Sequence, residues 1–398
     1  MIATGLDRLL QDPGELAGRR YGLLAHGASV TAGCVPAHLA LAAAGAPPSR
    51  LFGPEHGYYG VEQDMVPSAS QRDPWTGVEI VSLYGSDEGS LLPRPEAFAG
   101  LDLLVVDLQD IGSRYYTYAA TAVWAAEAAR AAGCEVWILD RPNPLGGAIV
   151  EGNLPHPGFA SFVGAFRIPV RHGLTLGEIV RLEAHRRQWG RLPRVLAVEG
   201  WSRADLWPAT GRPWIAPSPN MPSFATALVY PGLCLLEATE LSEGRGTTRP
   251  FLLFGAPDLR PTALAEALAP LAEMGVAAVP TYFRPQFQKH QGETCGGVEL
   301  VVQDETKVRG YRLGLEILCA LKSVAPQLFR WREAPYEFVA DRPAIDLLTG
   351  SDVFRRALDG DPSADLGAWF ATFTADEREF REERREILLY PEERSSSK

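Results

Sequence analysis

The feature that most constrains the fold is the apolar run at residues 101–108, whose only charged side chains are the aspartates at 102 and 107. A strand that is apolar along nearly its whole length is typical of a parallel sheet with helices on both faces. Four more short runs of strand character occur, at 21–25, 50–52, 78–84 and 135–140. Stretches expected to be helical, at 36–45 and 117–132, alternate with them. This alternation predicts an α/β fold with a Rossmann-like, mainly parallel sheet.

The chain has 398 residues, which is more than a single hydrophobic core usually supports, so two domains are expected. We place a Rossmann-like catalytic domain at residues 1–225 and a smaller α/β (α+β) domain at 226–394, with a cleft between them. The second domain shows two helical patterns and one strand, at 261–274, 308–323 and 297–302. The polar tail at 395–398 should fray.

Composition excludes several kinds of partner. The formal net charge is −11 and no basic stripe is present, so nucleic acid is not expected to bind. No apolar run reaches the ~20 residues that cross a bilayer, and no signal-peptide pattern opens the chain. We therefore expect no membrane partner and a cytoplasmic location. The five cysteines are scattered, and no metal-binding or nucleotide-binding motif is present, so neither a metal nor another cofactor is expected.

The strand predicted at 50–52 ends in an acid and an imidazole, Glu55 and His56. Pro54 and Gly57 flank this pair and stiffen the turn, so both side chains should point the same way. A glutamic acid in a partly desolvated cleft can protonate a leaving oxygen, and the histidine beside it can assist. We take Glu55 and His56 as candidate catalytic residues. The alternative is that Glu55 only caps the segment that follows.

Other polar side chains stand at the predicted carboxyl ends of strands, where ligands bind in sheets of this kind. Asp107 and Asp110 end the 101–108 run, and either could activate water, stabilise cationic charge at a sugar carbon or hold the substrate. The alternative is that both carboxylates are tied to a nearby arginine and to backbone amides. His26 and Tyr84 lie at two further strand ends and are candidates for substrate binding.

Two polar segments, at 112–118 and 242–249, supply further candidates for substrate binding. An arginine beside a helix N-terminus can attract an anion, tyrosines can contact a sugar, and glycines let a backbone approach a ligand closely. The candidates from these segments are Arg114, Tyr116, Tyr118, Glu243, Arg245, Thr247 and Arg249. Three proline-containing turns add Asn143, Arg171, His172 and Asn220. For each of them the alternative is a structural role, as a core aromatic, a turn former or part of an ion pair.

Together these motifs resemble the exo-β-N-acetylmuramidase family of the NamZ type, once catalogued as a domain of unknown function. The matching segments follow one another through nearly the whole chain, at 51–57, 107–118, 139–144, 169–173, 217–222, 241–250, 292–297 and 388–390. The resemblance implies a Rossmann-like domain, a smaller second domain and a cleft between them. It also implies release of terminal N-acetylmuramic acid from the non-reducing ends of peptidoglycan fragments, in cell-wall turnover or recycling. The family's catalytic glutamate falls on Glu55.

On this interpretation the protein is a glycoside hydrolase that works without a metal on a small saccharide. Glu55 acts as general acid with the help of His56, and Asp107 or Asp110 activates water or orients the 2-acetamido group of the substrate. One of the candidate arginines should meet the lactyl carboxylate of muramic acid. Two alternatives stay open: a glycosidase for another N-acetylhexosamine, and a non-catalytic protein that binds muropeptides or sugars.

Overall fold

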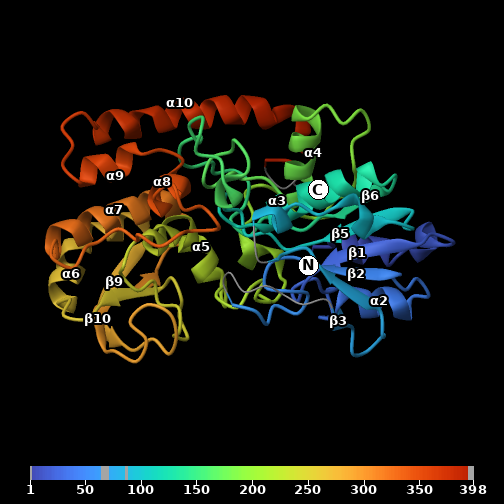
Figure 1. Ribbon diagram of the computed structural model, residues 1–398, viewed down its shortest axis with the longest axis horizontal. Helices are drawn as coiled ribbons and strands as arrows, with labels where there is room; N and C mark the ends of the chain where they lie inside the picture. Colours follow the sequence, from blue (N-terminus) through green and yellow to red (C-terminus); the bar gives the residue numbers. More distant parts are fainter. Residues whose placement is uncertain (1, 64–70, 86–87, 393–398) are drawn as a thin grey trace, which may run out of the picture.

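A computed structural model of the protein describes residues 2–63, 71–85 and 88–392, so the tail at 395–398 lies outside the described residues. Two lobes lie side by side in Figure 1, the amino-terminal half of the chain on the right and the carboxyl-terminal half on the left. The long helix α10 (Leu366–Arg384) runs along the top of both lobes. No helix in the described part of the chain has the length and apolar character needed to cross a membrane.

Within the described residues, the amino-terminal lobe is built on a seven-stranded sheet. Its strands are β1 (Tyr21–Ala25), β2 (Arg50–Gly53), β3 (Gln71–Arg72), β4 (Glu79–Ser82), β5 (Leu103–Asp107), β6 (Glu135–Leu139) and β7 (Arg194–Leu196). Their order is β3-β4-β2-β1-β5-β6-β7, and all neighbours are parallel except β3 and β4. Without the short β3 this is the Rossmann order, in which the winding reverses between β1 and β5. The predicted Rossmann-like sheet is therefore confirmed.

Helices cover both faces of this sheet, and they are α1 (Gly5–Leu9), α2 (Ala37–Ala43), α3 (Tyr118–Ala131) and α4 (Leu176–Arg186). Neighbouring residues of a strand point to opposite faces, so each strand contributes to two cores. Leu23 and Val105 belong to the core on the side of α1 and α2. Leu24 and Val106 belong to the core on the side of α3 and α4. A strand buried on both faces has to be apolar throughout, which explains the run at 101–108.

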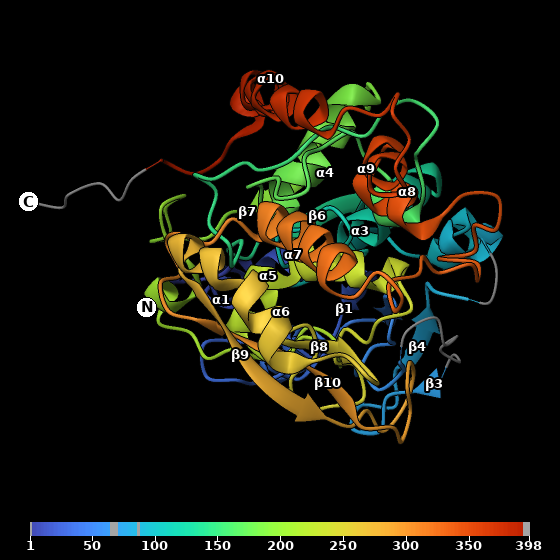
Figure 2. The ribbon, with the colours of Figure 1, turned by 90° about the vertical axis from the view of Figure 1, so that its left-hand side faces the viewer.

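The carboxyl-terminal lobe holds a smaller antiparallel sheet. Its two longest strands pair with each other, one at the centre of the sheet and the other at an edge. Its strands are β8 (Leu253–Ala256), β9 (Val276–Phe283) and β10 (Cys295–Val302), in the order β8-β10-β9. The helices of this lobe are α5 (Phe224–Leu233), α6 (Pro261–Ala267), α7 (Gly310–Val324), α8 (Ala344–Thr349) and α9 (Val353–Leu358). Figure 2 shows α6 lying against this sheet, and α7 packs against α6 and α5. The expectation of a smaller second α/β region is confirmed.

One helix differs from the sequence expectation. The helix predicted at 261–274 stops at Ala267 and continues as a 3₁₀ segment (Ala269–Met274), because Pro270 has no backbone N–H to extend the α-helix. The boundary placed after residue 225 falls in the first turn of α5, and α5 packs against α7 of the carboxyl-terminal lobe.

A buried arginine joins the two lobes behind the cleft. Arg114 donates hydrogen bonds to the carbonyl oxygens of Asn153 (2.8 Å) and Ile168 (3.0 Å), and to that of Leu348 in α8 (2.9 Å). Its side chain is almost fully buried, and burial lowers its pKa. Arg114 was predicted to bind substrate, but the structure uses its donors on backbone carbonyls and thereby fixes α8 against the amino-terminal lobe.

Candidate active site

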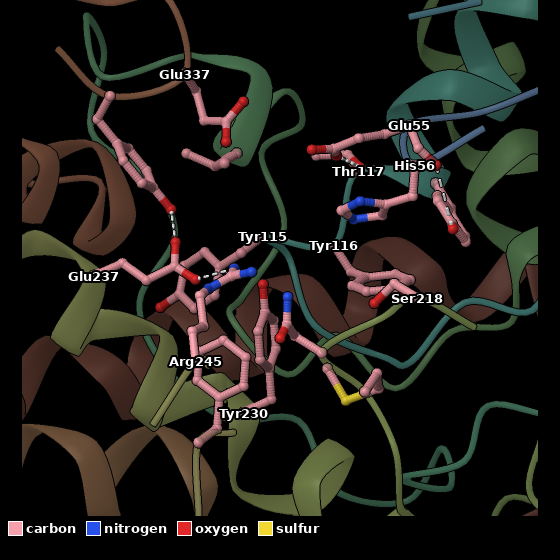
Figure 3. Close-up of a pocket in the computed structure, with 16 residues that line it drawn as sticks. Glu55, His56, Tyr115, Tyr116, Thr117, Ser218, Tyr230, Glu237, Arg245 and Glu337 are labelled. Atoms are coloured by element: carbon pink, nitrogen blue, oxygen red, sulfur yellow. Dashed lines mark hydrogen bonds and ion pairs between the residues drawn. The ribbon is translucent and has the colours of Figure 1, made fainter. Parts of the chain in front are cut away.

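A pocket opens between the lobes at the carboxyl ends of the parallel strands (Figure 3). The empty space between its walls is about 490 Å³, open solvent at the mouth included. The amino-terminal lobe contributes one side, here called the sheet wall, made of residues 55–56 and 115–118. The carboxyl-terminal lobe contributes the loop wall, made of Tyr230, Glu237, Arg245, Phe251, Tyr336 and Glu337. The predicted site residues that line the pocket are Glu55, His56, Tyr116, Tyr118, Asn220 and Arg245.

Glu55 is presented by a tight turn that starts where β2 ends. Gly57 donates its N–H to the carbonyl of Pro54 at 3.0 Å, and His56 and Gly57 have left-handed backbones with φ of +68° and +77°. Gly53 has no room for a side chain, since a Cβ there would lie 2.7 Å from a backbone nitrogen of the returning chain. The glycines and the proline therefore fix the direction in which Glu55 leaves the sheet.

Thr117 orients the carboxyl group of Glu55. Its hydroxyl donates to Glu55 Oε2 at 2.6 Å, although Thr117 is the N-cap residue of α3 and would ordinarily cap that helix. Tyr118, the next residue, donates its hydroxyl to the Pro217 carbonyl at 2.8 Å. Glu55 is 5% exposed, and its other carboxyl oxygen points into the pocket (Figure 3). The local geometry thus leaves Glu55 accessible from the pocket and from almost nowhere else.

The segment after the turn supports the rim of the pocket. His56 Nδ1 lies 3.0 Å from the carbonyl of Glu62, so Nδ1 carries the proton that is donated, and Nε2 is the acceptor when the ring is neutral. The ring faces the pocket in Figure 3. Asn220, from the opposite rim, donates its side-chain amide to Gln63 Oε1 at 3.1 Å. These contacts bring the predicted residues His56 and Asn220 to the same opening.

The loop wall is held by an ionic network. Arg245 Nη2 donates to Glu237 Oε1 at 2.6 Å, and the Tyr336 hydroxyl donates to Glu237 Oε2, also at 2.6 Å. Arg245 Nε is 3.5 Å from Glu243 Oε1, and Lys289 Nζ is 2.9 Å from Glu243 Oε2. Two cations and two carboxylates balance each other, which makes this buried cluster tolerable. Glu243, predicted to bind substrate, instead supports Arg245 from behind.

The rest of the 242–249 loop does not line the pocket. Gly246 is left-handed (φ +79°), and a Cβ there would meet the carbonyl oxygen of Phe287 at 2.6 Å, so this glycine allows the loop to pack closely. Thr247 donates its hydroxyl to a carbonyl of its own loop at 2.6 Å. Arg249 is exposed and forms an ion pair with Glu299. The predicted binding roles of Thr247 and Arg249 are therefore not supported, because both side chains serve the loop and the lobe surface.

Asp107, predicted as a second catalytic carboxylate, does not reach the pocket. Its two oxygens accept from Arg141 Nε at 2.6 Å and from Arg141 Nη2 at 2.9 Å. Both side chains are almost fully buried, so this bidentate pair is shielded from water. The prediction is corrected: Asp107 fixes the ends of β5 and β6 to each other.

Asp110 and His172 also lie in the interior rather than on a wall of the pocket. Asp110 Oδ2 accepts the N–H of Gly112 at 2.7 Å and lies 3.7 Å from His172 Nε2. Burial raises the pKa of Asp110 to about 7 and lowers that of His172 to about 3, so near neutral pH the imidazole is neutral and Asp110 is about half protonated. The structure thus does not support a direct catalytic role for Asp110 or substrate contact by His172.

His26 uses both ring nitrogens on the backbone. Its Nδ1 donates to the Pro217 carbonyl at 3.0 Å, and its Nε2 accepts the N–H of Gln109 at 2.9 Å. Burial, aided by the charge of Arg141, lowers the pKa of His26 to about 3, which keeps the ring neutral as this bonding requires. His26 was predicted to bind substrate, but it connects the ends of β1 and β5 to the Pro217 turn.

Three more predicted residues have structural partners. Asn143 donates its side-chain amide to a backbone carbonyl at 2.9 Å and accepts a backbone N–H at 2.9 Å. Arg171 is 1% exposed and donates to a carbonyl of the carboxyl-terminal lobe at 3.3 Å. Tyr84 is buried with its ring near those of Phe162 (6.0 Å) and Phe338 (6.1 Å). None of these three lines the pocket, so their predicted binding roles are not supported.

Sequence reasoning missed several lining residues for different reasons. Tyr115, Thr117 and Ser218 line the pocket and lie inside the segments 112–118 and 217–222, in which other residues are predicted to bind substrate. Glu237 carries a readable signal, since an acid that directly follows the apolar run 233–236 has to be buried with a partner. No such signal marks Glu337, because its position depends on a turn that the local sequence does not predict.

Within the described residues, no group of three or more histidine, cysteine, aspartate or glutamate side chains is arranged to bind a metal ion. The carboxylates that line the pocket, Glu55, Glu237 and Glu337, are distributed over its two walls. The arrangement is suited to proton transfer and to recognition of a polar, anionic ligand.

Comparisons with known proteins cover nearly the whole chain. The family model of the exo-β-N-acetylmuramidase NamZ N-terminal domain matches residues 21–225, and that of its C-terminal domain matches residues 228–390. The peptidoglycan β-N-acetylmuramidase NamZ of Bacillus subtilis (strain 168) is 36% identical over 393 residues, which cover 98% of this chain and 91% of that protein.

Solved structures show the same fold. A DUF1343 family protein from Bacteroides fragilis NCTC 9343 superposes with a TM-score of 0.83 at 30% identity, over 98% of this chain and 99% of the other. A second DUF1343 family protein from the same organism gives 0.75 at 26% identity, over 99% and 100%. The resemblance inferred from the motifs is confirmed, and the chain belongs to the exo-β-N-acetylmuramidase NamZ family.

Proposed function

We propose that this protein is an exo-acting β-N-acetylmuramidase, a glycoside hydrolase that releases terminal N-acetylmuramic acid from the non-reducing ends of peptidoglycan fragments. The observation that carries the proposal is the buried carboxyl of Glu55, which a single turn and one hydroxyl direct into the pocket. The Bacillus subtilis relative is a peptidoglycan β-N-acetylmuramidase, which supports the same reaction here.

Glu55 has the placement of a general acid. Cleavage of a glycosidic bond requires a proton on the leaving oxygen as the bond to the anomeric carbon breaks. Thr117 occupies one carboxyl oxygen, and the other faces the pocket, where it can reach that bridging oxygen. His56 presents Nε2 as an acceptor to the same space, so it can receive a hydrogen bond from a substrate hydroxyl and hold the sugar against Glu55.

Arg245 supplies the cation for the lactyl carboxylate that distinguishes muramic acid from glucosamine. It lines the pocket on the loop wall, opposite the sheet wall (Figure 3). A guanidinium has five N–H donors in a rigid fork, so Arg245 can serve a ligand carboxylate while Glu237 holds it in place. Because Glu237 fixes the guanidinium before substrate arrives, little side-chain entropy is lost on binding.

Tyrosines give the pocket a surface suited to a sugar ring. Tyr115, Tyr116 and Tyr230 all line it, and each is buried apart from the face turned to the pocket.

The test uses a defined disaccharide in which N-acetylmuramic acid is β-1,4-linked to N-acetylglucosamine. Incubation followed by mass analysis should show both free monosaccharides, and reaction with longer fragments should remove one muramic acid unit at a time. The disaccharide with the two sugars in reverse order should stay intact, because its non-reducing end lacks the lactyl group.

Two results would contradict the proposal. Saturable binding of the disaccharide without any product would indicate a muropeptide-binding protein. Hydrolysis confined to chromogenic N-acetylglucosaminides or N-acetylgalactosaminides would indicate a glycosidase for another N-acetylhexosamine.

A further inference from the structure

A strained turn brings Glu337 into the pocket. Tyr336 and Val339 exchange two backbone hydrogen bonds, of 3.0 and 2.9 Å, around a two-residue loop. Both loop residues, Glu337 and Phe338, have left-handed backbones, with φ of +47° and +66°. This is the pattern of a type I′ turn, which normally takes Asn-Gly because left-handed conformations disfavour residues with a Cβ. Glu and Phe are both conformationally unfavourable at these two positions of the turn.

Contacts on both sides keep the turn in place. The Tyr336 hydroxyl is bonded to Glu237 at 2.6 Å, and the ring of Phe338 packs near that of Tyr84 (6.1 Å). Glu337 itself is 5% exposed and lines the pocket. Non-glycine residues held in such conformations cluster at functional sites, where the surrounding structure over-determines them. The unfavourable turn therefore has a use, which is to place a carboxylate at this point.

Glu337 faces the sheet wall. In Figure 3 it extends from the loop wall toward the space that the Glu55 carboxyl enters from the other side. The third carboxylate lining the pocket, Glu237, has one oxygen bonded to Arg245 and the other to Tyr336. Asp107 is bound to Arg141 outside the pocket. Of the two carboxylates on the loop wall, Glu337 is the one turned toward the Glu55 side of the pocket.

We propose that Glu337 is the second catalytic carboxylate of the hydrolysis and the base that activates water; this rests on the function proposed above. As Glu55 gives its proton to the bridging oxygen, the bond between that oxygen and the anomeric carbon breaks, and its electron pair stays with the oxygen. A water oxygen bonds to the anomeric carbon from the opposite face, and its proton passes to Glu337. Solvent then restores the proton of Glu55 and removes that of Glu337.

The pocket opens to solvent, which supplies the attacking water. Two carboxylates on opposite walls with a water between them are the arrangement of inverting glycosidases. The reaction should therefore release the α-anomer first from a β-linked substrate.

The test compares three variants on the muramic acid disaccharide. Glu337→Gln should lower kcat roughly 10²–10⁴-fold with little change in KM, the range of lost acid–base catalysis. Glu337→Gly should be similarly inactive yet at least as stable to heat as the parent, because glycine removes the left-handed strain. Glu333→Gln, at an exposed carboxylate four residues earlier, is the matched control and should leave kcat unchanged. Proton NMR of the parent reaction should show the α-anomer before mutarotation.

Each contrary result has a distinct meaning. A Glu337→Gln variant with near-parental kcat, or first release of the β-anomer, would overturn the role of Glu337 as base. Lowered heat stability of Glu337→Gly together with normal kcat of Glu337→Gln would assign the residue to structure alone. If the parent protein releases no muramic acid at all, the proposed function fails instead.

Discussion

The two walls of the pocket are built in different ways. The sheet wall depends on backbone geometry. Glu55 is positioned by a strand end, a glycine turn and the first turn of α3, with a single hydroxyl contact at 2.6 Å. The loop wall depends on side-chain charge, since Glu237 holds Arg245 and Tyr336 through both of its oxygens. The difference matches the two tasks that we propose for the site, proton transfer on the sheet wall and recognition of an anion on the loop wall.

This division has a physical reason. A general acid has to change its protonation state in every cycle, so a permanent ion pair would hold it in one state. A cation that binds a ligand has to stay charged and fixed in place, so carboxylates paired with it improve its ability to bind. Behind the sheet wall, Asp107 and Arg141 likewise form a fixed ion pair, and both side chains are almost fully buried.

The largest effect is expected on the sheet wall. Glu55→Gln removes the transferable proton but keeps the size of the side chain and its contact with Thr117. The rate on a chromogenic muramide should fall roughly 10²–10⁴-fold or more, with the midpoint of thermal unfolding nearly unchanged. Kinetics and a melting curve on the same preparation check both parts.

Glu62→Gln is the matched control for Glu55. Glu62 contacts His56 through its backbone carbonyl, so changing its side chain should leave the rate intact. Near-parental turnover by Glu55→Gln would remove Glu55 from the chemistry and, with it, the distinction between the two walls.

The layer behind the sheet wall should respond in stability rather than in rate. Asp107→Asn leaves the buried guanidinium of Arg141 without a counter-charge, which should cost about 3–5 kcal/mol of unfolding free energy. Denaturant titration measures this loss, and kcat per folded molecule should change little. A variant of parental stability with a collapsed kcat would show that Asp107 takes part in catalysis after all.

The loop wall should control which sugar is accepted. Arg245→Ala should lower kcat/KM for muramides roughly 10- to 100-fold, the scale of a charge-assisted hydrogen bond, and affect glucosaminides much less. The ratio of the two substrates is the measurement, because it cancels any general loss caused by leaving Glu237 unpaired.

Arg249→Ala provides the comparison from the same loop. Arg249 is exposed and paired with Glu299, so its removal should leave the substrate ratio as in the parent. If Arg245→Ala lowered kcat/KM equally for both substrates, this arginine would support the loop wall without recognising the lactyl group.

The sequence was sufficient where the signal is local. Apolar runs identified the strands, and the Rossmann rule placed Glu55 and His56 at the correct edge of the sheet. The prediction failed where a polar residue near a strand end turned inward. At this sheet edge, His26 is hydrogen-bonded to the backbone, Asp107 is paired with Arg141, and Asp110 is buried. A strand end fixes the neighbourhood of a side chain but not its direction.

The loop wall was harder still to predict. Arg245 was found because it sits in a dense polar motif, whereas Glu237 and Glu337 come from segments that carry no motif. Their roles depend on contacts with residues far away in the sequence, such as the Tyr336 hydroxyl that reaches Glu237. Such pairings arise from tertiary packing, and no periodicity or spacing encodes them.

The smallest expected effect concerns Asp110, and its measurement tests whether water reaches the interior behind the sheet wall. Burial raises the pKa of Asp110 to about 7 from its ordinary 3.8, so the folded protein holds this proton more tightly than the unfolded chain. The resulting stabilisation is complete below about pH 4 and is lost as pH rises through 7, by at most about 1.4 kcal/mol per pH unit. Asp110→Asn stays neutral, so its unfolding free energy should lack this fall. Urea titrations of parent and variant between pH 4 and 7.5 should therefore diverge, and parallel curves would show that water or a counter-charge reaches Asp110.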